Sequence, residues 1–88
     1  MTLSQLKKDL KPGLKLQVIN HIRKEVIGST SQVVKVQSNA FFHVYDNDKE
    51  KRPFHIEYPK ASLVVYDIDT LTIYLDEKTL LISFKIIN

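Results

Sequence analysis

The sequence predicts a mainly β domain that begins with one short helix. Apolar and polar residues alternate through most of the chain after residue 13, which is the period of a β-strand. Short turn-forming segments separate the alternating stretches, so consecutive strands are close enough in sequence to pair antiparallel. At 88 residues the chain is long enough for one small domain.

Residues 1–13 predict the helix and its cap. Thr2 and Gln5 have the spacing of a capping box, and three leucines fall on one stripe of a helix over 2–10. Pro12-Gly13 ends it. A helix this short has marginal stability in isolation, and we therefore expect it to pack on the sheet. The three leucines are Leu3, Leu6 and Leu10.

Residues 14–60 predict a first series of strands. The alternating stretches are Leu14–Ile22, Gln32–Gln37, Phe41–Tyr45 and Phe54–Tyr58. Between the last two, residues 46–53 carry no apolar side chain except Pro53, which predicts an exposed hairpin loop.

Residues 61–88 predict a three-stranded meander. A turn at Asp69-Thr70 places Ile68 opposite Leu71, and a loop over 76–79 places Leu75 opposite Leu80. One face then carries ten apolar or aromatic residues: Val64, Tyr66, Ile68, Leu71, Ile73, Leu75, Leu80, Ile82, Phe84 and Ile86. The other face carries Leu63, Val65, Tyr74, Leu81 and Ile87. That second face needs a cover, either the leucines of the first helix or a second protein.

These elements together predict a strongly curled antiparallel sheet, or a small SH3-like or OB-like barrel, of five to seven strands. The pattern leaves the strand order open. With 43% apolar and 26% charged residues, the composition is that of a folded domain.

Several classes of protein are disfavoured by what the chain lacks. It has no cysteine, so it has neither disulfides nor thiolate metal ligands. No apolar run reaches the roughly 20 residues that span a bilayer, and the N-terminal residues do not resemble a signal peptide, so we expect a cytoplasmic protein that does not bind membranes.

Catalytic, metal and cofactor sites are not predicted. His21, His43 and His55 have no recognised triad or ligand spacing, and the two glycines form no phosphate-binding loop. Asp46-Asn47-Asp48 lacks the glycine and the distant glutamate of a calcium loop. We therefore expect a protein that is not an enzyme.

Charge and aromatic residues predict a binding surface. Residues 1–35 hold seven basic and two acidic residues, a net charge of +5, whereas residues 36–88 have a net charge of −2. A basic half is compatible with a polyanionic partner. Aromatic residues also flank the basic loop at 46–53, where they would either stack on a ligand or fill the core. The candidate binding residues are Lys7, Lys8, Lys11, Lys15, Arg23, Lys24, Phe41, Tyr45, Lys49, Lys51, Arg52, Phe54 and Tyr58.

Three stretches resemble small accessory proteins encoded by phages and integrative elements of Gram-positive bacteria. They are Leu10-Lys11-Pro12-Gly13, Val34-Lys35-Val36-Gln37-Ser38-Asn39 and Tyr58-Pro59-Lys60-Ala61-Ser62. The resemblance implies a mobile-element protein of small β-barrel type in a bacterial host cell. Phage proteins of this size are often inhibitors of host defence, including anti-CRISPR proteins.

Three hypotheses for function follow. The first is a non-enzymatic binding module that acts on nucleic acid or a nucleoprotein. The second is an inhibitor that docks on a host defence nuclease, as anti-CRISPR proteins do. The third is homo-oligomerisation through the C-terminal meander. The identity of the partner and the oligomeric state are left open by the sequence.

Overall fold

Seven antiparallel strands form one open sheet in the computed structural model, which describes residues 3–87. The strand order is β4-β3-β2-β1-β7-β6-β5. In chain order the elements are α1 (Leu3–Asp9), β1 (Lys15–His21), the 3-10 turn η1 (Lys24–Val26), β2 (Thr30–Val36), β3 (Ala40–Tyr45), β4 (Phe54–Glu57), the 3-10 turn η2 (Ala61–Leu63), β5 (Val64–Asp67), β6 (Thr70–Asp76) and β7 (Thr79–Ile86).

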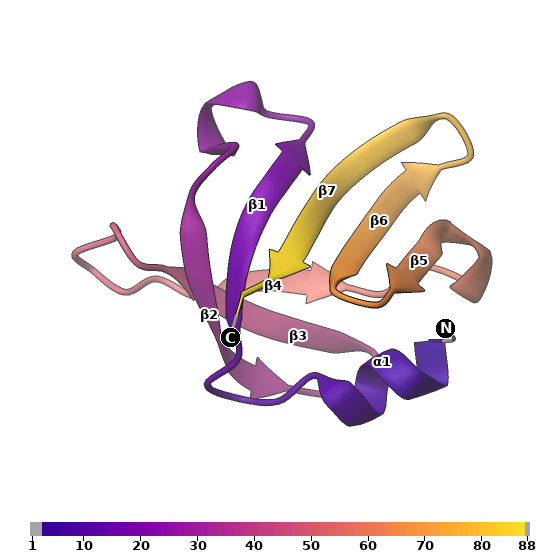
Figure 1. The fold of residues 1–88 in the computed structure, drawn as a ribbon, viewed down its shortest axis with the longest axis horizontal. Helices are drawn as coiled ribbons and strands as arrows, with labels where there is room; N and C mark the ends of the chain where they lie inside the picture. Colours follow the sequence, from indigo (N-terminus) through magenta and orange to yellow (C-terminus); the bar gives the residue numbers. More distant parts are fainter. Residues whose placement is uncertain (1–2, 88) are drawn as a thin grey trace.

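The predicted mainly β architecture, with a short N-terminal helix and an antiparallel sheet, is confirmed (Figure 1). Closure into a barrel is not found, because among the described residues β4 and β5 are free edges that do not pair with each other. The two halves of the sheet nevertheless share a core. Phe41 of β3 and Phe84 of β7 are both fully buried, and their rings meet edge to face at 6.0 Å.

The second turn of the meander has the predicted register, whereas the first turn lies one residue earlier than expected. Leu71 pairs with Phe84 and Ile73 with Ile82, as the loop over 76–79 required. In the β5–β6 pairing, Tyr66 is opposite Leu71, which is a shift of two residues from the predicted register. A shift of two keeps the same side chains inward, so the predicted core face survives.

Two residues predicted for that face lie outside the core. Ile68 occupies the first position of the tight turn, with φ 41°, and is 76% exposed. Leu75 lies within a register irregularity between Ile73 and Asp76 and is 52% exposed. A bulge of this kind turns a side chain away from its strand's alternation.

The helix covers the inner face of the sheet and not the outer face. Leu6 and Leu10 are buried in the same cluster as Tyr66 and Phe84. The Tyr66 hydroxyl donates a hydrogen bond of 2.7 Å to Asp9 Oδ2, which ties the end of α1 to β5. In Figure 1, α1 lies below β5 and beside one end of β3. The capping role expected for Thr2 falls outside the described residues.

The predicted outer face of the meander is less apolar than expected. Leu63 is buried in η2 and Leu81 packs partly against the core. A hydrogen bond of 2.8 Å joins the Thr72 and Ser83 hydroxyls. Val65 and Ile87 are the apolar residues of the predicted set that remain exposed. None of the helices within residues 3–87 is both long enough and apolar enough to cross a membrane.

Candidate binding site

At one end of the inner face the core opens into a pocket of about 480 Å³, here called the aromatic pocket. Its walls come from the end of β1, from β3 and β4, and from the loop over 46–53 between them. The volume falls in the range of about 300–1,000 Å³ that is usual for small-ligand pockets. The lining residues used below are His21, Arg23, His43, Tyr45, Asp48, Arg52, Phe54 and His55.

Tyr45 and Phe54 form the aromatic wall of the pocket. Their ring centroids are 5.3 Å apart at 73°, and Phe54 is 47% exposed. They point to the inner face because strand side chains alternate, and Phe54 pairs directly with His43 across the β3–β4 ladder. Burial raises the pKa of Tyr45, so its hydroxyl stays neutral at physiological pH. The wall therefore offers aromatic surface to a ligand without adding charge.

His43 lies behind this wall and is 1% exposed. Its ring packs edge to face against Phe84 at 5.2 Å and against Tyr45 at 5.0 Å. Burial lowers the pKa of His43 to about 4, so the imidazole is neutral at pH 7. Its Nδ1 atom is buried and has no hydrogen-bond partner within residues 3–87. A buried polar atom without a partner is unusual in a folded protein.

His21 lies at the end of β1 and is held in one tautomer. Its Nδ1 accepts a hydrogen bond of 2.8 Å from the backbone N–H of Arg23. Burial first, and then the positive charge of Arg23, lower the pKa of His21. The neutral ring therefore carries its proton on Nε2 and is a hydrogen-bond donor there.

Arg52 is positioned by the loop over 46–53. The Asp48 carboxylate accepts hydrogen bonds from the backbone N–H of Glu50 at 3.0 Å and from the backbone N–H of Arg52 at 3.2 Å. The Arg52 Nε also donates to Asp48, at 3.1 Å. The Arg52 guanidinium, and then these backbone groups, keep the pKa of Asp48 below its usual range. Asp48 thus organises the loop and sets the direction of Arg52.

Arg23 supplies a second guanidinium at the pocket. Its Nε pairs with Glu25 at 3.2 Å, and its side chain is well exposed. An exposed ion pair of this kind is weak, since water screens it. A guanidinium carries five N–H donors, so an arginine paired through Nε can still bind a phosphate or carboxylate group. The pocket thus combines an aromatic wall with two cations.

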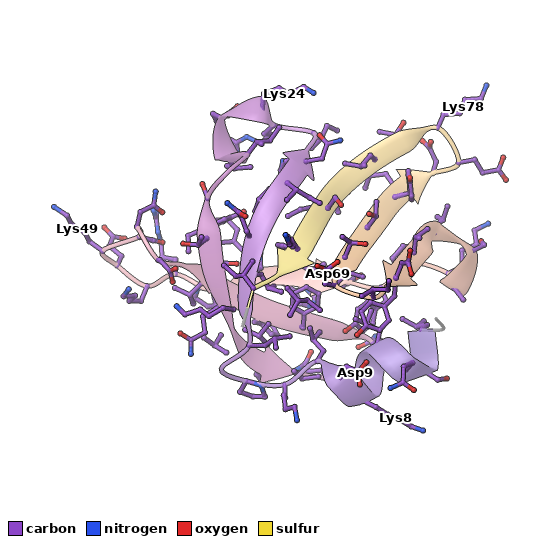
Figure 2. All side chains as sticks on the ribbon, in the orientation of Figure 1. Lys8, Asp9, Lys24, Lys49, Asp69 and Lys78 are labelled. Atoms are coloured by element: carbon purple, nitrogen blue, oxygen red, sulfur yellow. The ribbon has the colours of Figure 1, made fainter. Side chains whose placement is uncertain are left out.

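The fold brings together four of the predicted binding residues: Arg23, Tyr45, Arg52 and Phe54. Lys49 and Lys51 lie on the same loop as Arg52. Figure 2 shows Lys49 at the tip of this loop, while Lys24 and Lys8 lie at other edges of the molecule. The basic residues of the first 35 therefore do not form one patch.

The remaining predicted residues have structural contacts. Phe41 is fully buried in the core, and Tyr58 packs against it at 6.0 Å. Lys7 lies over the Tyr58 ring at 5.9 Å. Lys15 pairs with Asp46 at 3.1 Å. Lys8 and Lys11 line a separate hollow that also contains two carboxylates, those of Asp9 and Asp69.

Four of the lining residues named above were not predicted as binding residues: His21, His43, Asp48 and His55. The alternation of β3 contained a signal, because His43 shares the face of Phe41 and Tyr45. Among the described residues, no three His, Asp or Glu side chains are grouped as metal ligands. Comparison with protein-family models, with curated proteins and with solved structures found no match.

Proposed function

We propose that this protein is a non-enzymatic binding module for single-stranded nucleic acid, free or within a nucleoprotein, and that the aromatic pocket holds one base and its phosphate. The observation that supports the proposal is the half-exposed ring of Phe54 beside Arg23 and Arg52. Sequence-tolerant binding of single strands combines aromatic stacking with cations that follow the phosphates. The pocket has both elements within one cavity.

Each part of the pocket has a distinct role in this proposal. The base stacks on Phe54, with Tyr45 packed against that ring. Arg52, held in place by Asp48, binds the phosphate, and Arg23 contributes a second positive charge. The Nε2–H of His21 donates a hydrogen bond to the base or to the sugar. The neutral pocket floor favours a base over a second phosphate.

Fluorescence anisotropy with labelled single-stranded DNA and RNA at several salt concentrations tests this function. Stacking contributes about 1–3 kcal/mol per base, so Phe54→Ala should weaken binding by about 5- to 150-fold. Arg52→Ala should weaken binding and reduce the salt slope by about 0.7, the value for one phosphate contact on a single strand.

The matched controls are not among the residues that line the pocket. Leu75→Ala removes an apolar side chain of similar exposure, and Lys78→Ala removes one positive charge at the β6–β7 turn, on the other side of the molecule from Lys49 (Figure 2). Both should bind as the unchanged protein does. Absence of binding at low salt would rule out the proposed function.

Docking on a host defence protein is the second candidate, and the same pocket favours it. Aromatic and arginine side chains are the residue types enriched in the hot spots of protein interfaces. Capture of a stable bacterial protein by the purified chain after nuclease treatment, lost in Phe54→Ala and retained in Leu75→Ala, would support docking. The mobile-element origin implied by the sequence resemblance stays a prediction.

A further inference from the structure

A second aromatic and basic feature adjoins the aromatic pocket at His55, and its side chains lie on the opposite face of the sheet from Phe54. Lys35, Phe42 and His55 are direct cross-strand partners on β2, β3 and β4, and here they are called the outer row. The Phe42 and His55 rings are stacked, with centroids 4.7 Å apart at 26°. The Lys35 Nζ lies 5.8 Å from the Phe42 ring centre.

The outer row presents its outermost ring to solvent. His55 is on the edge strand, and its side chain is 41% exposed. Phe42 supports one face of the imidazole, and the Glu57 carboxylate lies 3.8 Å from its Nδ1. Lys35 makes no ion pair with any other residue in the range 3–87, so its charge is available to a ligand.

The edge strand connects the outer row to the aromatic pocket. Phe54 and His55 are consecutive residues of β4, and consecutive strand residues point to opposite faces. Both residues line the pocket region, and β4 has a free edge among the described residues. A chain that leaves the pocket over this edge therefore meets the His55 ring next, followed by the positive charge of Lys35.

We propose that a single strand crosses the free edge of β4, with one base in the aromatic pocket and the following base stacked on His55 of the outer row. This inference rests on the proposed function and extends it. Lys35 contacts the phosphate that follows the second base. Stacking on histidine, as on other aromatic side chains, is a usual way to bind an unpaired base. The site then takes at least two nucleotides, and the outer row adds affinity without reading sequence.

The test compares a mononucleotide with an octanucleotide of one repeated base, measured by calorimetry. The unchanged protein should bind the octanucleotide at least 10-fold more tightly. Lys35→Ala and Phe42→Leu should each weaken octanucleotide binding by about 5-fold or more and leave mononucleotide binding unchanged. Val65→Ala, an exposed residue on the outer face of β5, is the control and should change neither affinity.

Amide chemical shifts give a second, independent measurement. The octanucleotide should shift the amide signals of Lys35, Phe42 and His55 in addition to those of the pocket, whereas the mononucleotide should leave Lys35 and Phe42 in place. Thermal unfolding confirms that Phe42→Leu is folded before its affinity is interpreted.

The outcomes separate this inference from the proposed function. If the octanucleotide binds no more tightly than the mononucleotide, or if Lys35→Ala and Phe42→Leu have no effect, the path over β4 is wrong and the pocket proposal stands. If both variants weaken mononucleotide binding equally, the outer row acts through the pocket and the inference is also wrong. If neither ligand binds the unchanged protein, both proposals are wrong.

Discussion

His43 is a neutral imidazole held in the core beside the aromatic pocket. Its pKa of about 4 in the folded protein lies below the usual 6.5 because burial penalises the charged form. The unfolded chain therefore binds a proton between pH 6.5 and 4 that the folded chain does not bind. By linkage, stability is complete above about pH 6.5 and falls as the pH drops toward 4. His21, whose pKa is also lowered, acts in the same direction.

Replacing His43 should flatten this pH dependence. Between pH 7 and pH 5, His43 should lower the free energy of unfolding of the unchanged protein by about 2 kcal/mol. The His43→Leu variant should not show this decrease. Urea denaturation at each pH measures it. Carboxylates such as Asp46, whose pKa is lowered from 3.8, titrate below this window.

An exposed residue that does not titrate provides the control for that experiment. Leu75→Ala should keep the slope of the unchanged protein, since it removes no titratable group and the side chain is 52% exposed. Equal slopes for His43→Leu and the unchanged protein would show that His43 is not the group that titrates.

At the scale of single residues, the sequence predicts some of the residues that line the pocket, but it does not predict that they line the same pocket. Residue type alone made four of them candidates: Arg23, Tyr45, Arg52 and Phe54. Their meeting depends on the β3–β4 hairpin placing Arg52 opposite the end of β1, which no local pattern encodes. Phe41 was a candidate for the same reason, yet its place in the alternation of β3 puts it in the core.

At the β5–β6 turn, the backbone has a conformation that the side chain of the turn residue disfavours. Ile68 is β-branched, and its φ of 41° lies in a region that favours glycine. A turn at Asp69-Thr70 together with strand alternation predicts that Ile68 faces the core. The true turn is one residue earlier, and a shift of two in register still keeps Val64 and Tyr66 of β5 on their predicted face.

Ile68→Gly should stabilise the protein by about 0.5–1 kcal/mol, because it relieves this strain and the lost side chain is 76% exposed. Urea denaturation at pH 7 measures the change. Gly28→Ala is the opposite case, since Gly28 has φ +94° and open space around its Cα, so only the backbone conformation is penalised. It should destabilise by about 1 kcal/mol. A destabilised Ile68→Gly protein would contradict the strained turn.

At the scale of the whole molecule, the helix closes a core that the open sheet leaves uncovered. The Cα radius of gyration of 12.1 Å is that of a compact domain of this length. Leu6 is fully buried although α1 has only seven residues. The sequence predicts that the helix packs on the sheet. Which face it covers depends on its contact with β5, which is distant in sequence, and a period-two pattern does not specify that contact.

Leu6→Ala should therefore cost about 2–5 kcal/mol, the range for truncating a buried leucine. That is a large part of the stability of a small domain, so a lower urea midpoint and partial unfolding at 37 °C are expected. Leu75→Ala, at 52% exposure, should change the midpoint little. Similar effects of the two substitutions would show that α1 does not pack on the inner face.

The ladder between β1 and β7 joins the two halves of the sheet, and it pairs Leu16 with Ile86. During synthesis the β2–β3–β4 half can form its hairpins early, whereas β7, the partner of β1, leaves the ribosome after the other six strands. Contacts between residues so distant in sequence slow folding to milliseconds or seconds. Until β7 arrives, β1 pairs with β2 alone, and its other edge is open to strands of other chains, so this edge is a point of misassembly.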